Sequence, residues 1–134
     1  MSSFFDTNIL VYAFLDLDKR QRALAVLAEG GTISAQVLNE FTHVARRKRQ
    51  RSWADIEAAV AVIRLRFPTI VPLTAETHAA ALLLARGHNL SFYDALIVAS
   101  ALEASCDTLY CEDMQNGRAF SGLKIINPFA AETP

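Results

Sequence analysis

A short apolar segment that runs directly into polar residues constrains the fold of this chain more than any other feature. Phe4-Phe5 has the character of a buried strand, Asp6-Thr7-Asn8 follows it, and a helical pattern starts at Ile9. In open α/β sheets, ligands bind outside the carboxyl ends of the strands. Asp6 is therefore expected where such a sheet places its chemistry, although the three polar residues also suit a helix cap.

The rest of the chain alternates short apolar strands with helical patterns, which indicates an α/β fold. Further strands are expected at residues 32–34, 69–72, 108–111 and 124–127, and helices over 19–29, 35–47, 53–67, 74–86 and 91–102. The last of these helices is apolar on almost every side, so it is predicted to be buried. Residues 114–120 suit a short helix or a loop, and the tail 130–134 is expected to fray.

Length and composition narrow the class of protein. A chain of 134 residues fits one domain with a sizeable core. The hydrophobic share of 52% and the charged share of 20% indicate that a partner covers some apolar surface, most simply a second copy. The net charge of −1 gives no overall attraction to nucleic acid or membrane. Because signal-peptide, membrane-span and CxxC patterns are all missing, a cytoplasmic protein is expected.

Four carboxylates share an unusual placement. Asp6 and Asp113 each follow an apolar strand, Asp94 starts the buried helix, and Glu40 lies on the flank of a helix that follows a strand. If the strands are parallel, these positions converge on one edge of the sheet. Carboxylates without an equal cluster of cations repel one another, and a hard divalent cation such as Mg²⁺ is their natural complement. One or two such ions can drive phosphodiester cleavage.

The basic segment Arg46-Arg47-Lys48-Arg49-Gln50-Arg51 has two interpretations, which the sequence leaves open. It is either a solvated helix end, where cations offset the helix dipole, or a patch that binds RNA phosphates. The apolar stripe that begins at Trp53 is expected in the core or at a dimer interface. His43, His78 and His88 lack metal-ligand spacing, so they are expected to be solvated or structural.

Four motifs in this order resemble the PIN-domain ribonucleases and, more narrowly, the VapC toxins of bacterial toxin–antitoxin pairs. They are Asp6-Thr7-Asn8 after an apolar strand, Glu40 within a helix, residues 91–97 (SFYDALI) and residues 109–117 (LYCEDMQNG). The resemblance covers about residues 3–128. It implies a single PIN-like domain over residues 1–134. The implied fold is a three-layer α/β/α sandwich with a short central parallel sheet of four to five strands surrounded by helices.

The resemblance also implies an endoribonuclease toxin that acts on RNA, is held by a small antitoxin and forms a homodimer. The implied catalytic and metal-binding residues, with Mg²⁺ or Mn²⁺ as the cofactor, are Asp6, Glu40, Asp94 and Asp113. Their expected polar neighbours are Thr7, Asn8, Ser91 and Asn116. The expected RNA contacts are Arg46, Arg47, Lys48, Arg49 and Arg51.

Two points depart from the family pattern or leave a choice. The family usually has Thr or Ser two residues before the last acid, whereas this chain has Cys111. Because a thiol is a poor hydrogen-bond donor, a looser Asp113 is expected. Glu112 is the alternative to Asp113, but neighbouring residues at a strand end point in opposite directions, and Asp113 is favoured.

Two other functions compete with the ribonuclease. A phosphatase of the haloacid dehalogenase type also has an Asp after its first strand, but it needs a second Asp where this chain has Asn8. A non-catalytic RNA- or protein-binding module on a PIN scaffold would have no need for four acids that repel one another.

Overall fold

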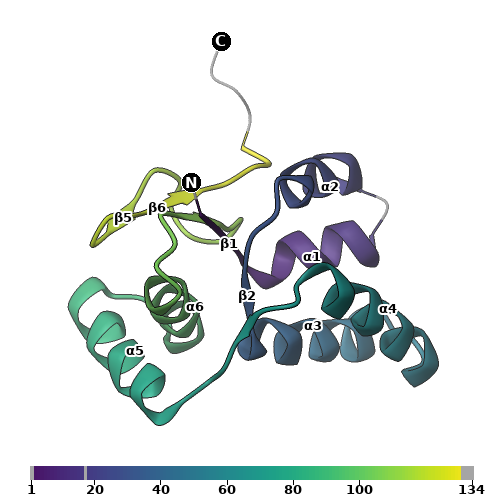
Figure 1. Ribbon diagram of the computed structural model, residues 1–134, viewed down its shortest axis with the longest axis horizontal. Coiled ribbons are helices and arrows are strands. Elements are labelled where there is room, and N and C mark those ends of the chain that lie inside the picture. The colour runs from purple at the N-terminus through teal and green to yellow at the C-terminus, as the bar shows by residue number, and fades with distance from the viewer. Residues whose placement is uncertain (1, 17, 131–134) are drawn as a thin grey trace.

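The computed structural model describes residues 2–16 and 18–130, so residues 131–134 of the predicted fraying tail lie outside the described part. Helices and strands alternate along this part of the chain (Figure 1). In order, they are β1 (Ser3–Phe5), α1 (Thr7–Phe14), α2 (Arg20–Ala28), β2 (Ile33–Ser34), α3 (Ala35–Arg47), α4 (Trp53–Arg66), β3 (Ile70–Val71), α5 (Ala75–His88), α6 (Phe92–Glu103), β4 (Thr108–Tyr110), β5 (Ala119–Phe120) and β6 (Leu123–Ile126).

The main sheet has four strands in the order β1-β4-β6-β5. Strands β1, β4 and β6 are parallel, while β5 pairs antiparallel with β6. Strands β2 and β3 form a separate parallel pair, which a bridge between Phe4 and Thr32 joins to β1. The predicted α/β fold with a central, mostly parallel sheet is confirmed. The antiparallel β5 was not predicted, because residues 114–120 were expected to form a helix or a loop.

The helices lie on two sides of β1 (Figure 1). Helices α5 and α6 pack against each other on one side, and α1, α2, α3 and α4 lie on the other. Helix α6 is buried at every position from Ala95 to Ala101, which confirms the prediction from its apolar sequence. The side chains of Phe4 and Phe5 are fully buried, so β1 lies in the centre of the core.

Gly31 allows residues 31–32 to approach β1 closely. A Cβ atom on Gly31 would lie 2.7 Å from the Ser3 carbonyl oxygen and 2.4 Å from the Phe5 ring. Without a side chain there, the Thr32 amide donates to the Ser3 carbonyl at 2.9 Å, and the Phe5 amide donates to the Thr32 carbonyl at 3.1 Å. This pairing brings β2, and with it the start of α3, next to β1.

Local capping residues set most helix boundaries. Ser34, Ser52 and Thr74 each cap the helix that follows, since each side-chain oxygen accepts a backbone N–H of the first turn. The predicted end of α5 before Gly87 is wrong. The helix continues to His88 and stops at Asn89, whose φ of 53° is left-handed, a conformation in which Asn often ends a helix. No helix in the described part is long and apolar enough to cross a membrane.

Candidate active site: an acidic cavity at the ends of β1 and β4

A cavity of about 500 Å³ opens at the carboxyl ends of β1 and β4. The parallel register pairs Phe5 with Tyr110, so the residues that follow each strand, Asp6 and Cys111, lie side by side. Helix α3 leads away from the end of β2, and helix α6 starts at the same cavity. All four predicted acids line it: Asp6, Glu40, Asp94 and Asp113.

Asp6 is the most enclosed of these acids, with only 5% of its surface exposed. One carboxylate oxygen accepts the Thr7 backbone N–H at 2.7 Å, which caps α1, and the other accepts the Cys111 thiol at 3.0 Å. Burial raises the pKa of Asp6 to about 6; the two hydrogen bonds oppose this rise, and the charges of Glu40 and Asp94 add to it. The capping role and a role in the cavity therefore coexist in one side chain.

Glu40 is half-buried on α3, and two side chains hold its carboxylate. The Thr7 hydroxyl donates to one oxygen at 2.6 Å, and the Gln36 amide donates to the other at 3.3 Å. Thr7, the residue after Asp6, therefore contacts an acid that lies 33 positions later in the chain. The polar residues at the start of α1 serve the cavity as well as the helix.

Asp94 and Asp113 complete the acidic lining. Asp94 lies half-buried in the first turn of α6, where its backbone N–H donates to the capping hydroxyl of Ser91 at 3.2 Å. Burial raises the pKa of Asp94, a second interaction of the Ser91 hydroxyl, with the Asp94 carboxyl group itself, opposes this, and the charge of Asp113 raises it further. Asp113 is exposed, and the Asn8 amide donates to its carboxylate at 2.8 Å.

The neighbouring acid Glu112 has a different environment. Its carboxylate accepts the Tyr12 hydroxyl and pairs with the Lys19 ammonium, both at 2.6 Å. Burial alone would raise the pKa of Glu112, but the hydrogen bonds from Lys19 and Tyr12 outweigh it and lower the pKa. Asp113, rather than Glu112, lines the cavity.

The Cys111 thiol forms a hydrogen bond with Asp6, whereas its effect was expected at Asp113. The thiol is fully buried and is the donor in this bond, whereas Asn8 holds Asp113. Burial raises the pKa of the Cys111 thiol, and the Asp6 charge raises it further, so the proton stays on sulfur. The expected loosening at Asp113 is corrected accordingly: the weak thiol donor affects Asp6.

Two predicted polar neighbours do not line the cavity: Ser91, which caps α6, and Asn116, which is engaged at the end of β6. Asn116 accepts the Asn127 backbone N–H through its side-chain oxygen at 2.8 Å. It joins the segment after β4 to the end of β6. Asn116 is only three positions from Asp113 in the sequence. Even so, Asp113 lines the cavity, while the Asn116 side chain contacts Asn127.

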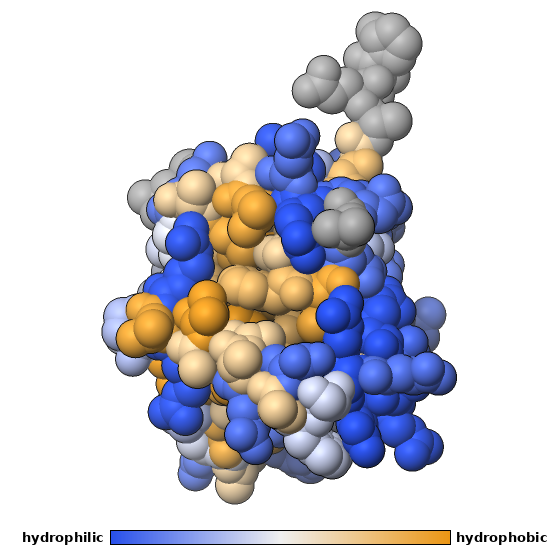
Figure 2. Space-filling model, turned by 90° about the vertical axis from the view of Figure 1, so that its right-hand side faces the viewer, coloured by the Kyte–Doolittle hydropathy of each residue, from blue (hydrophilic) through white to orange (hydrophobic). Residues whose placement is uncertain are grey.

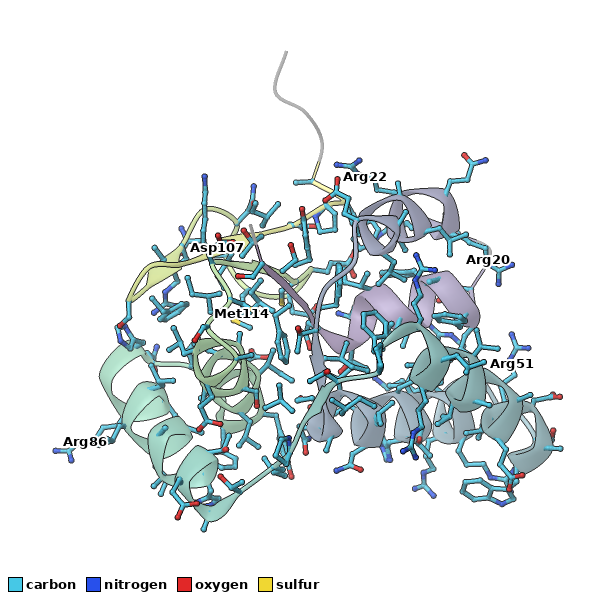
Figure 3. The ribbon with its side chains drawn as sticks, viewed as in Figure 1. Arg20, Arg22, Arg51, Arg86, Asp107 and Met114 are labelled. Atoms are coloured by element: carbon cyan, nitrogen blue, oxygen red, sulfur yellow. The ribbon has the colours of Figure 1, made fainter. Side chains whose placement is uncertain are left out.

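The basic segment divides into two groups. Arg49 forms a two-pronged pair with Asp16 at 2.7 and 2.8 Å. Arg51, labelled in Figure 3, donates to the Leu15 carbonyl at 2.7 Å. These two side chains therefore tie the α3–α4 connection to the end of α1. Arg46, Arg47 and Lys48 are exposed and have no carboxylate partner among the described residues, which leaves three of the five predicted RNA contacts unpaired on the surface.

The acidic cavity has five further lining residues that were not predicted from the sequence: Gln36, Asn39, His43, Val44 and Tyr93. The first three lie on α3, where Asn39 is three positions after Gln36 and His43 is four positions after Asn39, so they share one face of the helix. That periodicity, applied to polar residues, could have found them. His43 in particular lines the cavity, although its sequence context suggested a solvated or structural role.

The lining suits a divalent cation by its chemistry. The donors are carboxylate oxygens, which Mg²⁺ and Mn²⁺ prefer, and at Asp6 and Asp94 the neighbouring acids raise the pKa. Among the described residues, no group of three or more His, Cys, Asp or Glu side chains is arranged as a ready-made metal site. The case for a divalent cation at this site therefore rests on two observations: the four acids share one cavity, and their oxygen atoms are the ligands that such a cation prefers.

Comparisons with known proteins agree with this architecture. The family model of the PIN domain matches residues 3–119. The VapC20 toxin of Mycobacterium tuberculosis, described as cleaving the sarcin–ricin loop, superposes with a TM-score of 0.70 at 24% identity, over 84% of this chain and 90% of that one. No protein with a curated description matches the sequence.

Two further solved structures share the fold. VapBC2 of Rickettsia felis, bound to a DNA fragment from its promoter, has a TM-score of 0.65 at 21% identity, over 93% of this chain and 97% of that one. A toxin–antitoxin complex from Klebsiella pneumoniae has a TM-score of 0.73 at 21% identity, over 97% of this chain and 100% of that one. At these identities, the likeness concerns the fold.

Proposed function

The chain belongs to the PIN domain family, and on this premise we propose that it is a Mg²⁺-dependent endoribonuclease that acts as the toxin of a toxin–antitoxin pair. The observation that carries the proposal is the convergence of four acids from four segments on one cavity. A binding module or a core-packing role gives no reason to gather carboxylates whose charges disfavour one another. Binding a phosphodiester through a divalent cation gives such a reason, because the cation needs carboxylate ligands.

Each side chain has a definite part in this proposal. Asp6, Glu40, Asp94 and Asp113 would hold the cation. When bound, it would supply an activated water and stabilise the negative charge that develops on the leaving oxygen. Thr7 and Gln36 orient Glu40, and Asn8 orients Asp113. Near neutral pH, the Asp6 carboxyl gives up a proton with a pKa of about 6, so cation binding competes with that proton.

A protein partner is supported by the apolar surface. Figure 2 shows an extended apolar area on the face turned toward the viewer, the side of the molecule on which Figure 1 places α1, α2 and α4. Leu24 on α2 and Val62 and Leu65 on α4 are exposed large apolar side chains of these helices. Exposed apolar areas of this kind are typical of protein interfaces. We assign the partners as a small antitoxin and a second copy of the chain, in keeping with the two toxin–antitoxin assemblies that share the fold.

The test is a cleavage assay with purified protein. We expect Mg²⁺ or Mn²⁺ to support internal cleavage of RNA, EDTA to abolish it, and a phosphomonoester to remain intact. Asp94→Asn should remove the activity. Asp107→Asn, an exposed acid at the start of β4 and so at the end of that strand away from Asp113, should keep it (Figure 3).

Three outcomes would contradict the proposal. Metal-dependent hydrolysis of the phosphomonoester would indicate a phosphatase. RNA binding without any cleavage would indicate a binding module. Cleavage by Asp94→Asn at the wild-type rate would place the activity somewhere other than this cavity.

A further inference from the structure

A second cavity, of about 880 Å³, adjoins the acidic one. Asn39 and His43 line both, so the two cavities meet along α3. Beyond these shared residues, the lining changes character. Arg46, Arg47 and Trp53 form much of the second cavity, and no acidic residue among those described lines it. The surface therefore passes from anionic to cationic over about two turns of one helix.

Trp53 is an unusual residue for this position. It is the first residue of α4, and 55% of its surface is exposed, although tryptophan is usually well covered. The stripe that begins at Trp53 was expected in the core or at a dimer interface; Ile56 and Ile63 are buried in the core, whereas Trp53 lies on the surface. The guanidinium of Arg46 lies 4.6 Å from the centre of the indole ring, which holds the ring at the cavity.

The two arginines are available to an anion. Arg49 is paired with Asp16, whereas neither Arg46 nor Arg47 has a carboxylate partner among the described residues. Arg46 makes one hydrogen bond, to the Arg51 carbonyl at 3.2 Å. A guanidinium with free N–H groups binds a phosphate through two parallel hydrogen bonds. The second cavity thus combines a flat aromatic face with two phosphate-binding groups.

We propose that this second cavity binds one unpaired nucleotide of the RNA, next to the phosphodiester held at the acidic cavity. Its base stacks on the Trp53 indole, its phosphate pairs with Arg46 and Arg47, and the strand between the two cavities passes Asn39 and His43. The base must be unpaired, because a base inside a duplex offers no face to an aromatic side chain. The subsite rests on the proposed ribonuclease function and adds the place where one base beside the cut is held: the Trp53 ring, with Arg46 and Arg47 at its phosphate.

The chain offers a direct reporter, because Trp53 is its only tryptophan. Titration in EDTA, where RNA stays intact, uses randomised single-stranded RNA octamers, the same octamers annealed into duplexes, and abasic octamers. Stacking tolerates any base, so a random pool is adequate. We expect the single-stranded octamers to quench the fluorescence, and the duplex and abasic octamers to leave it nearly unchanged.

Variants test the contribution of each group. Trp53→Ala should weaken binding of single-stranded RNA about 10-fold and raise KM with little change in kcat, and Trp53→Phe should recover most of the affinity. Arg47→Gln should lower the salt dependence of binding by about one unit of slope. Arg86→Gln is the matched control, because Arg86 extends from α5 on the opposite side of the molecule (Figure 3), and it should leave the slope unchanged.

The outcomes separate this subsite from the proposed function. If wild type cleaves RNA but Trp53→Ala keeps the same KM and affinity, the subsite is wrong and the ribonuclease stands. If single-stranded RNA quenches Trp53 but Mg²⁺ supports no cleavage, the ribonuclease fails and the cavity remains an RNA-binding site. RNA binding that leaves the Trp53 fluorescence unchanged overturns the subsite outright.

Discussion

The acidic cavity and the basic segment lie along the same helix, α3, yet the fold holds them in opposite ways. Glu40 and Asp6 have their carboxylates fixed by contacts with Thr7, Gln36 and Cys111 in partly or fully buried surroundings. The basic segment lies on the surface, where Arg46, Arg47 and Lys48 have no carboxylate partner among the described residues, and Arg49 and Arg51 are bound to Asp16 and Leu15.

The comparison shows that like charges in one short stretch of sequence need not share a role. Arg47 faces a cavity and Arg49, two positions later, forms an ion pair. Glu112 and Asp113 divide in the same way. Position along the chain brings such residues close, and the packing around them decides which are available to a ligand.

The largest effect on RNA cleavage is expected when the two neighbouring acids, Glu112 and Asp113, are each replaced in a separate variant. Asp113→Asn should reduce RNA cleavage about 1000-fold, since it removes a charge from the cavity where the transition state is stabilised. Glu112→Gln should stay near the wild-type rate, because its carboxylate pairs with Lys19 instead. Rates measured at saturating Mg²⁺ decide the matter, and equal damage from both substitutions would remove the distinction between the two acids.

The next effect concerns stability without metal. The pKa of Asp6 is about 6 in the folded chain against an ordinary value of 3.8, so the folded state keeps a proton that the unfolded state releases. Folding stability should therefore fall as pH rises from about 4 to about 6, by roughly 3 kcal/mol at most. Asp6→Asn lacks this loss, so in EDTA it should match wild type near pH 3.5 and be the more stable protein at pH 7.5.

Urea unfolding across this pH range measures the effect. Asp107→Asn, an exposed acid outside the cavity, should follow the wild-type curve. Mg²⁺ at millimolar concentration should restore wild-type stability at pH 7.5 by binding only the folded state. A wild type that remains the more stable protein at pH 7.5 in EDTA would mean that Asp6 carries no such cost.

A smaller effect is expected from the thiol behind Asp6. Cys111→Ala removes the donor to one Asp6 oxygen and should lower activity about 10-fold, the usual scale for a group that orients a metal ligand. Cys111→Ser keeps a donor and should retain most of the activity. Cys106→Ala, at the other buried cysteine, is the control. If Cys106→Ala by itself lowers the activity, the loss seen in Cys111→Ala would be explained by altered core packing, not by the missing donor to Asp6.

The smallest effect separates the two kinds of arginine. Arg49→Gln should cost less than about 1 kcal/mol of stability, because the pair with Asp16 is partly exposed. It should leave RNA affinity unchanged. Arg47→Gln should weaken RNA binding and leave the melting temperature unchanged. Thermal melts and RNA titrations at several salt concentrations give both readouts, and the reverse pattern would exchange the roles assigned to these two residues.

Much of the architecture could be predicted because it depends on short-range patterns. Helix α3 follows from the spacing of its apolar residues and from the Ser34 cap, and it spans Ala35–Arg47 as expected. The burial of α6 follows from a sequence that is apolar on nearly all sides. The four acids were found because strand ends and helix starts in a parallel sheet meet at one edge, which is a property of the fold class.

Some local predictions were wrong where two signals competed. Gly87 suggested the end of α5, but a single glycine costs a helix only about 1 kcal/mol, and Asn89 in the left-handed conformation ends it. Residues 114–120 lacked a clear period, and the strand β5 within them exists because β6 pairs with it.

The sequence by itself determined the order of the elements, the helix caps and the positions of the acids, since each depends on residues within a few places of one another. Strand alternation already favoured Asp113 over Glu112. Only the tertiary structure decided that Arg47 rather than Arg49 faces a cavity, and that Asp6 is the partner of Cys111. Those outcomes depend on contacts between residues 33 to 105 positions apart. Such contacts form only when the sheet register and the helix packing bring the two segments together, and no local pattern encodes them.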